Sequence, residues 1–213
     1  MKTTITFLAC LVSLVIYGQD EIMINGQPCG MHGSSNSGTP EYDLNPLKNR
    51  YNIPTNADID RAITLQNLVS RKSTGNAYKT SQAVDITGYV LDVKIGGIES
   101  CNCHAKTADL RDTHIEITIS SSATGPGDRF IAEVTPRIRQ MMKNQGKDWS
   151  TETLKKTIKG KMVRIKGWLL YDAEHEKEAF ANDPGNNTGR KNWRATCWEI
   201  HPITFLETVT AKK

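Results

Sequence analysis

The 213-residue sequence has few of the features that mark a membrane protein, a nucleotide-binding protein or a strongly charged binding protein. Its one long apolar run lies at the N-terminus, and no other stretch is long enough to span a membrane. It contains no phosphate-binding glycine loop, no nucleophile elbow and no internal repeat. The net charge of +4 is small, so it permits contact with a polyanion without demanding one.

The N-terminus has the three zones of an export signal. Lys2 supplies a positive charge, residues 5–17 form an apolar stretch, and the small Gly18 precedes a polar segment. The stretch is shorter than the roughly 20 residues that a membrane-spanning helix needs. We therefore predict a signal peptide over residues 1–18 and a secreted or periplasmic mature protein. Two alternatives are a buried N-terminal helix and a lipoprotein signal that ends at Cys10.

Cysteine is scarce, and removal of Cys10 with the signal leaves an even number. An even set in an oxidising compartment favours disulfides, with three possible full connectivities. A bridge between Cys101 and Cys103 would be strained, so each is expected to reach a distant partner, Cys29 or Cys197. The competing interpretation is a metal site formed by Cys101, Cys103 and His104, although this spacing is not a usual zinc spacing.

Residues 19–82 are predicted to be an extended N-terminal segment and linker. Residues 30–40 are rich in Gly, Ser and Asn, which is typical of a flexible connection. One short helix is expected after Thr55 or Asn56, where the following apolar residues recur at helical spacing: Ile59, Ala62, Ile63 and Leu68.

From residue 83 the pattern changes to β-structure. Apolar and polar residues alternate over segments that predict five strands: 84–93, 113–119, 129–134, 162–171 and 193–206. Residues 137–159 have a helical period, with a start near Ser150 and a stop at Gly160. Five strands with a helix between the third and fourth predict a mainly β, OB-like barrel over residues 83–213. The alternative is a five-stranded α+β sandwich.

Histidines beside carboxylates are the most distinctive polar feature of the strands. Glu199 and His201 share one face of a strand, as do Asp112 and His114, because side chains alternate along a strand. Such groups can bind a divalent metal for hydrolysis, of the phosphodiesterase type, or act as a general acid and base. The predicted metal ligands are His114, His175, His201, Glu133 and Glu199. Alternatively, each of these residues has a structural role on an exposed strand face, in a turn or in a buried network.

Aromatic residues next to basic residues predict a second kind of site. Trp193 lies between Lys191 and Arg194, and such a platform can stack the bases of a nucleic acid or the rings of another oligomeric ligand. Arg137 is the fourth candidate for ligand binding. The alternative is that the tryptophans pack in the core.

Several motifs taken together resemble a known group of proteins. They are Asp112-x-His114, Glu133-Val134-Thr135-Pro136, Gly167 followed by Asp172-x-x-His175, and Glu199-Ile200-His201-Pro202. The chain is similar over residues 84–207 to a broad group of uncharacterised secreted bacterial proteins with D-x-H, E-[IV]-x-P, G-x-x-x-x-D-x-x-H and E-[IL]-H-P motifs. The resemblance implies an OB-type barrel and export. Exported thermonucleases also use an OB barrel, but their pattern of paired Asp, Glu and two Arg is not recognisable here.

The leading expectation is therefore a secreted OB-like binding module for nucleic acid or another oligomeric ligand. A metal-dependent hydrolase is the alternative, and a structural or interaction module is the third hypothesis. The first of these rests on fold analogy, and a fold does not fix a function.

Overall fold

The computed structural model describes residues 21–70, 72–185, 189 and 191–209. The predicted signal peptide 1–18, including Cys10, lies outside these residues. Within the described ranges, no helix is long and apolar enough to cross a membrane.

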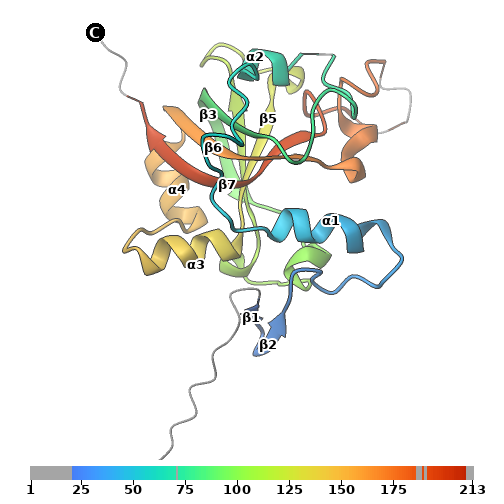
Figure 1. Ribbon diagram of the computed structural model, residues 1–213. Helices are drawn as coiled ribbons and strands as arrows, with labels where there is room; N and C mark the ends of the chain where they lie inside the picture. Colours follow the sequence, from blue (N-terminus) through green and yellow to red (C-terminus); the bar gives the residue numbers. More distant parts are fainter. Residues whose placement is uncertain (1–20, 71, 186–188, 190, 210–213) are drawn as a thin grey trace, which may run out of the picture.

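Five antiparallel and parallel strands close into a barrel in the order β3-β4-β5-β7-β6 (Figure 1). Neighbouring strands are antiparallel except for β5 and β7, which run parallel. This order, with helices between the third and fourth barrel strands, confirms the predicted OB-like barrel. The strands are β3 (Ala83–Ile95), β4 (Thr113–Thr118), β5 (Phe130–Val134), β6 (Met162–Tyr171) and β7 (Trp198–Thr208).

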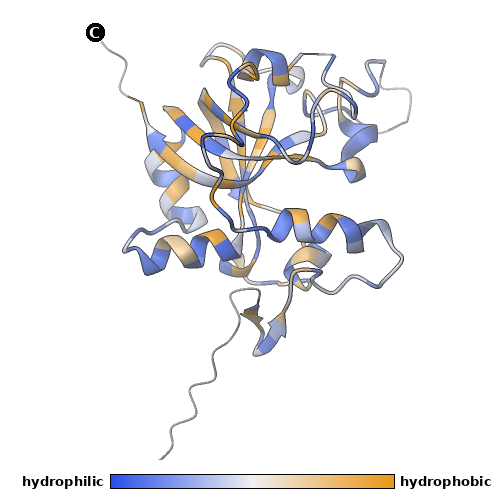
Figure 2. Cartoon of the chain, in the orientation of Figure 1, coloured by the Kyte–Doolittle hydropathy of each residue, from blue (hydrophilic) through white to orange (hydrophobic). Residues whose placement is uncertain are grey.

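The apolar side chains of the alternating strands form one core. Hydrophobic residues gather on the strands in Figure 2, and Val90, Ile115, Phe130 and Leu169 are fully buried there. Gly167 lets β7 cross β6 closely, because a Cβ at this position would occupy the space of the Pro202 carbonyl oxygen. A glycine at this position of β6 is thus required by strand packing.

The predicted helical segment 137–159 forms two helices, α3 (Pro136–Asn144) and α4 (Thr151–Ile158). They lie together on one side of the barrel (Figure 1). Ser150 caps α4 by accepting a hydrogen bond from the Thr153 N–H, as its sequence position indicated. A single helix was not formed, since Gly146 adopts a positive φ of 74° that turns the chain between the two.

The N-terminal segment contains more regular structure than its composition predicted. β1 (Ile22–Ile24) and β2 (Gln27–Cys29) form a hairpin, and α1 (Pro40–Asn49) begins where a flexible linker was expected to end. Residues 55–64 form turns, so the predicted helix is reduced to α2 (Leu65–Leu68). Its cap is Thr64, whose side chain accepts a hydrogen bond from the Asn67 N–H.

This segment is bonded closely to the barrel. Arg50 donates hydrogen bonds to the carbonyl oxygens of Thr80 and Leu169, and Arg137 donates to those of Cys29 and Gly30. Each bond joins a buried or partly buried side chain to backbone far away in the sequence. The segment is therefore an integral layer of the fold.

One disulfide joins Cys29 to Cys103, across 74 residues of sequence. This confirms that Cys103 reaches a distant partner. The expectation that every mature cysteine pairs was wrong, because Cys101 and Cys197 are buried free thiols in the described structure. The competing Cys101, Cys103 and His104 metal site is also not formed, since Cys103 is oxidised and His104 Nδ1 hydrogen-bonds to Ser34.

Candidate metal centre

A cluster of buried charged side chains lies where the barrel meets the N-terminal segment. The pairing of β4 with β5 places His114 opposite Glu133, and the parallel pairing of β5 with β7 places Glu199 opposite Ile131. Glu199 and His201 lie on the same face of β7, because they are two residues apart on a strand. Three strands therefore direct imidazole and carboxylate groups to one place.

Three of these residues form a compact group with metal-ligand atoms. Asp112, Glu133 and His201 each offer one atom, and these atoms all lie within 4.8 Å of one another. His201 Nε2 is 3.7 Å from Asp112 Oδ2, and His201 Nδ1 is 3.4 Å from Glu133 Oε2. The exposed fractions are 1% for Asp112, 5% for Glu133 and 0% for His201.

The polar atoms of this group lack the hydrogen bonds that burial normally requires. Among the described residues, no group makes a hydrogen bond of ordinary geometry with either carboxylate oxygen of Asp112 or with His201 Nε2. Asn102 and His201 lie near Asp112 and favour its charged form, yet they leave both oxygens unpaired by this criterion. Buried unpaired polar groups are costly, so these atoms indicate a missing partner.

Neighbouring residues fix the orientation of the group. His114 Nδ1 is 2.9 Å from Glu133 Oε1, and Glu199 Oε2 is 3.4 Å from His201 Nδ1. The other oxygen of Glu199 accepts a 2.7 Å hydrogen bond from Arg194, which is 0% exposed. Partners of this kind hold a histidine ring so that its second nitrogen is presented to a ligand.

Burial and charge shift the ionisation of the carboxylates in opposite directions. Burial raises the pKa of Glu133 well above its usual value, and the neighbouring Glu199 and Asp112 add to this shift. Burial also raises the pKa of Asp112. For Glu199, burial alone would raise the pKa, but Arg194 and His201 outweigh it and hold the pKa below its ordinary range. Burial lowers the pKa of His114 to about 3, so this imidazole is neutral.

Lys48 from α1 provides the second buried cation. Its ammonium group lies 2.8 Å from Glu99, 3.0 Å from Asp172 and 3.5 Å from Glu174. Burial alone would lower the pKa of Lys48, but Glu99 and Asp172 raise it well above its ordinary value. The lysine is 3% exposed and charged.

The cluster carries an excess of negative charge. Among the described residues it contains five carboxylates, and two fixed cations, Lys48 and Arg194, lie against them. When all five carboxylates are ionised, they exceed Lys48 and Arg194 by three charges. Buried charges of this kind are normally paired or bound to a metal, or they take up protons. The five carboxylates are Glu99, Asp112, Glu133, Asp172 and Glu199.

The structure brings together some of the predicted metal ligands and separates others. Glu133, Glu199 and His201 are in the cluster, and His114 adjoins it. His175 is not part of it: its side chain is 34% exposed and its Nδ1 lies 2.9 Å from Glu178. The reason is that His175 lies in a short helical turn after β6, and the Trp193 ring lies between it and His114.

Sequence reasoning missed Asp112 as a ligand, although it noted that Asp112 and His114 share a strand face. It also missed Lys48, which lies in the expected N-terminal extension, and Glu99, which lies between two predicted strands. Cys101 was considered as a ligand only in a different metal site, with Cys103 and His104. In Figure 1, α1 lies beside the short helical turn after β3 that carries Cys101. No local pattern signals this contact, which is made by tertiary hydrogen bonds from Asn45 and Asn49 to residues 100 and 101.

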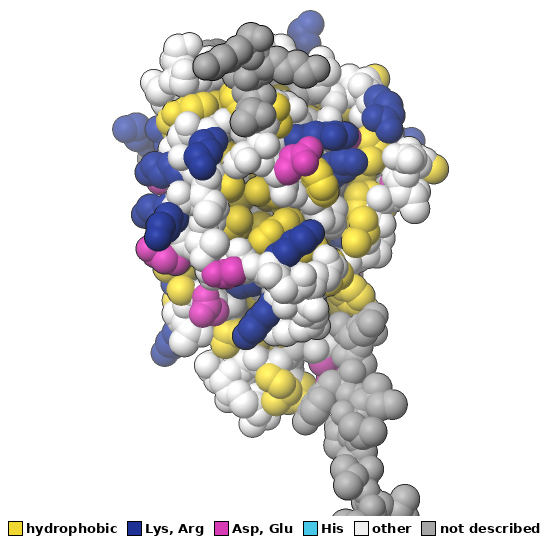
Figure 3. Space-filling view, turned by 90° about the vertical axis from the view of Figure 1, so that its left-hand side faces the viewer, with side chains coloured by type: hydrophobic (Ala, Val, Ile, Leu, Met, Phe, Trp, Pro, Cys, Tyr) yellow, Lys and Arg dark blue, Asp and Glu magenta, His cyan; other side chains and the backbone are white. Residues whose placement is uncertain are grey.

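The residues predicted to bind an oligomeric ligand do not form one exposed surface. Arg194 is buried against Glu199, and Arg137 is buried against backbone carbonyl oxygens. Trp193 is half-buried between His114 and His175, and its indole N–H donates to Glu178. Lys191 is exposed. Figure 3 shows one face of the molecule, where Lys and Arg side chains are spread out and Asp and Glu lie among them.

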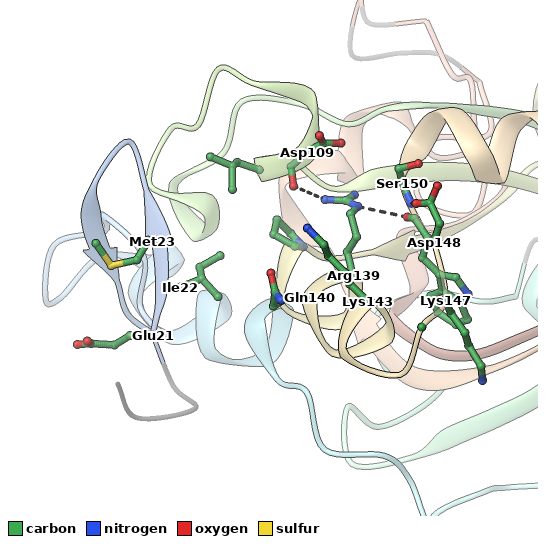
Figure 4. Close-up of a pocket in the computed structure, with 14 residues that line it drawn as sticks. Glu21, Ile22, Met23, Asp109, Arg139, Gln140, Lys143, Lys147, Asp148 and Ser150 are labelled. Carbon is green, nitrogen blue, oxygen red and sulfur yellow. Dashed lines mark hydrogen bonds between the residues drawn. The ribbon is translucent and has the colours of Figure 1, made fainter. Parts of the chain in front are cut away.

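Two hollows differ in their relation to the cluster. A polar pocket of about 380 Å³ has Lys48 and Glu99 in its wall, together with Glu174 and His104, so it adjoins the cluster. A larger groove of about 740 Å³ lies between β1 and α3 (Figure 4). The groove contains no residue of the cluster, and its Arg139 is engaged with the carbonyl oxygens of Asp109 and Trp149.

Comparison with known proteins gives no family for this chain. No family model matches the sequence, and no curated protein matches it.

Proposed function

We propose that this protein is a metal-dependent hydrolase whose divalent cation is held by Asp112, Glu133 and His201. One observation carries the proposal: three buried ligand atoms converge within 4.8 Å of one another, and within the described chain neither the Asp112 oxygens nor His201 Nε2 has a hydrogen bond of ordinary geometry. A cation would satisfy these atoms and offset the excess negative charge of the cluster.

The number and type of ligands fit a catalytic centre. Catalytic zinc sites commonly use three protein ligands of the histidine and carboxylate type and keep one position for water. A bound cation would supply a water of lowered pKa, close to 7 in favourable cases. Arg194 and Glu199 would keep the His201 ring in place, and His114 would orient Glu133 through its Nδ1 hydrogen bond.

The polar pocket beside the cluster is the proposed approach for substrate. Glu99 lines this pocket, and its ligand atom also lies within 4.8 Å of that of Asp112. Glu99 thus belongs both to the wall of the pocket and to the group of ligand atoms around Asp112. We propose hydrolysis of phosphodiester-type bonds, because a cation both activates water and stabilises the charge that develops on phosphoryl oxygens.

The binding-module hypothesis has less support. Arg194 and Arg137, which were expected to contact a ligand, are committed to internal partners. Lys191 and the exposed edge of Trp193 remain candidates for contact with an oligomeric ligand. The experiment below therefore also tests whether the protein binds a nucleic acid without cleaving it.

We also propose that the protein acts outside the cytoplasm. The N-terminal export pattern and the Cys29–Cys103 disulfide support this location, since disulfides persist mainly in oxidising compartments. Export would also expose the cluster to the divalent cations of the surroundings.

The test is hydrolysis of bis(p-nitrophenyl) phosphate by metal-free protein after addition of Mn²⁺ or Zn²⁺. We expect turnover that depends on the cation and falls at least 100-fold in Asp112→Asn and in His201→Ala. Glu207→Gln is the matched control, because Glu207 is exposed and pairs with Arg164 and not with a residue of the cluster. Absence of cation-dependent turnover, with salt-dependent binding of single-stranded DNA in its place, would favour the binding module.

A further inference from the structure

We infer that the centre holds a second cation, bound by the Cys101 thiolate and Glu99 and bridged to the first by Asp112. This inference extends the proposed metal centre by a neighbouring position with a sulfur ligand. The first position has only oxygen and nitrogen ligands, so the two positions differ in chemistry.

The geometry of the second position is as compact as that of the first. Ligand atoms of Glu99, Cys101 and Asp112 all lie within 4.8 Å of one another. Asp112 belongs to both groups, and a carboxylate has two oxygens that can each bind one cation. Bridging carboxylates are a usual feature of two-metal hydrolytic sites, where the cations lie roughly 3.5–4 Å apart.

A second observation points to a ligand at this place. Asn102 is 1% exposed, and within the described part of the chain neither its amide nitrogen nor its amide oxygen has a hydrogen bond of ordinary geometry. Asp112 beside it also has two unpaired oxygens by the same criterion. Asn102 and Asp112 are neighbours and both are buried with polar atoms that lack well-formed hydrogen bonds, which is rare in folded proteins.

Lys48 occupies one of the two oxygens of Glu99. Its ammonium group and the Cys101 thiol both contact Oε2 of this carboxylate, and neither of these hydrogen bonds uses Oε1. Lys48 also has Asp172 and Glu174 as partners, so it stays paired when Glu99 shares its charge with a cation.

Charge balance favours two cations over one. When all five carboxylates are ionised, they exceed Lys48 and Arg194 by three negative charges. Burial raises the pKa of the Cys101 thiol, and its ionisation on binding a cation adds a fourth charge. Two divalent cations neutralise these four charges. When the second cation binds, the S–H bond of Cys101 breaks, a metal–sulfur bond forms and the proton passes to solvent.

The disulfide preserves the thiol for this role. Cys103, two residues away, is oxidised with Cys29, while Cys101 stays reduced and buried next to Glu99. A thiolate selects soft or borderline cations, so Zn²⁺ and Cd²⁺ should enter this position and Mg²⁺ and Ca²⁺ should not.

The test is a Cd²⁺ titration of metal-free, disulfide-intact full-length mature chain, followed by ultraviolet absorbance and equilibrium dialysis. We expect a sulfur-to-cadmium charge-transfer band and about two Cd²⁺ per chain. In Cys101→Ser the band should disappear and the stoichiometry should fall to about one. Cys197→Ser is the control, because this other free thiol hydrogen-bonds to Asn182 outside the cluster and its loss should leave the band unchanged.

The outcomes separate this inference from the proposed function. One Cd²⁺ per chain without a charge-transfer band would overturn the second position and leave the first intact. Binding of no cation would overturn both. A band that survives in Cys101→Ser and disappears in Cys197→Ser would place the sulfur ligand elsewhere. Glu99→Gln is a second variant that keeps the thiol. The Cd²⁺ affinity measured from the charge-transfer band should fall at least tenfold in this variant.

Discussion

Replacement of Lys48 by methionine tests whether the N-terminal segment contributes a real charge to the cluster. The lysine is 3% exposed and forms ion pairs of 2.8 and 3.0 Å with Glu99 and Asp172. Removal of one partner from a buried ion pair typically costs about 3–5 kcal/mol, because the other charge is left uncompensated. The half-exposed Glu174 adds little to this value, since solvent screens it.

The assay is urea unfolding of metal-free protein with an intact disulfide, followed by tryptophan fluorescence. With a slope of about 2 kcal/mol per molar urea, the midpoint should fall by about 1.5–2.5 M. Lys159→Met is the matched control: Lys159 pairs with Asp92 at 2.6 Å, but both side chains are partly exposed, so about 0–1 kcal/mol is expected. A midpoint change in Lys48→Met as small as that of the control would refute the reasoning.

Three further predictions concern the scaffold. Loss of the disulfide in a Cys29→Ser, Cys103→Ser double variant should lower the free energy of unfolding by roughly 4.5 kcal/mol, from the chain entropy of a 74-residue separation; an unchanged urea midpoint would contradict this. Gly167→Ala should cost about 1–3 kcal/mol, because the new Cβ meets Ile200 and the Pro202 carbonyl, whereas Gly30→Ala, with open space around it, should not. Burial raises the pKa of Cys197 to about 12, so less thiolate forms and its alkylation by iodoacetamide in native protein should be at least about tenfold slower than in urea; equally fast native labelling would be the contrary result.

The barrel was predictable because its signals are local. The alternation of isoleucine with polar residues at 113–119 predicts the strand, although β4 is buried on both faces, and Gly88 and Gly167 lie where strands pack closely. The strand expected at 193–206 begins later, at Trp198, because residues 193–197 fold against the 179–183 segment. From the sequence, the polar residues of β4 could also lie on an exposed face. In the structure His114 and Glu116 are buried, and they contact charged and aromatic side chains.

The N-terminal segment was harder to predict, since its order depends on distant partners. Pro40 starts α1 and Pro46 lies within it, so local propensity gives a weak helix signal. What holds α1 is the pairing of Lys48 with Glu99 and the bonds from Asn45 and Asn49 to the loop after β3. None of these contacts has a periodic signature in the sequence.

The candidate site was predictable in kind and only partly in membership. The i, i+2 rule placed Glu199 with His201 and Asp112 with His114, and the barrel brought Glu133 to both. The same rule did not show which residue of each pair would offer a ligand atom to the metal site. Cys101 was considered as a metal ligand only together with Cys103 and His104, and the even cysteine count favoured disulfides over that site, whereas Cys101 is a buried free thiol.

Mn²⁺ binding to metal-free protein, measured by electron paramagnetic resonance and equilibrium dialysis, tests the central claim most directly. Mn²⁺ prefers oxygen and nitrogen ligands, so it reports on Asp112, Glu133 and His201 without relying on the thiol. We predict saturable binding that raises the free energy of unfolding by about 2.7 kcal/mol at 100 times the dissociation constant. Affinity should fall at least tenfold in Asp112→Asn and His201→Ala and stay unchanged in Glu207→Gln. Absence of saturable binding to the unaltered protein, or equal affinity in all four proteins, would contradict the account.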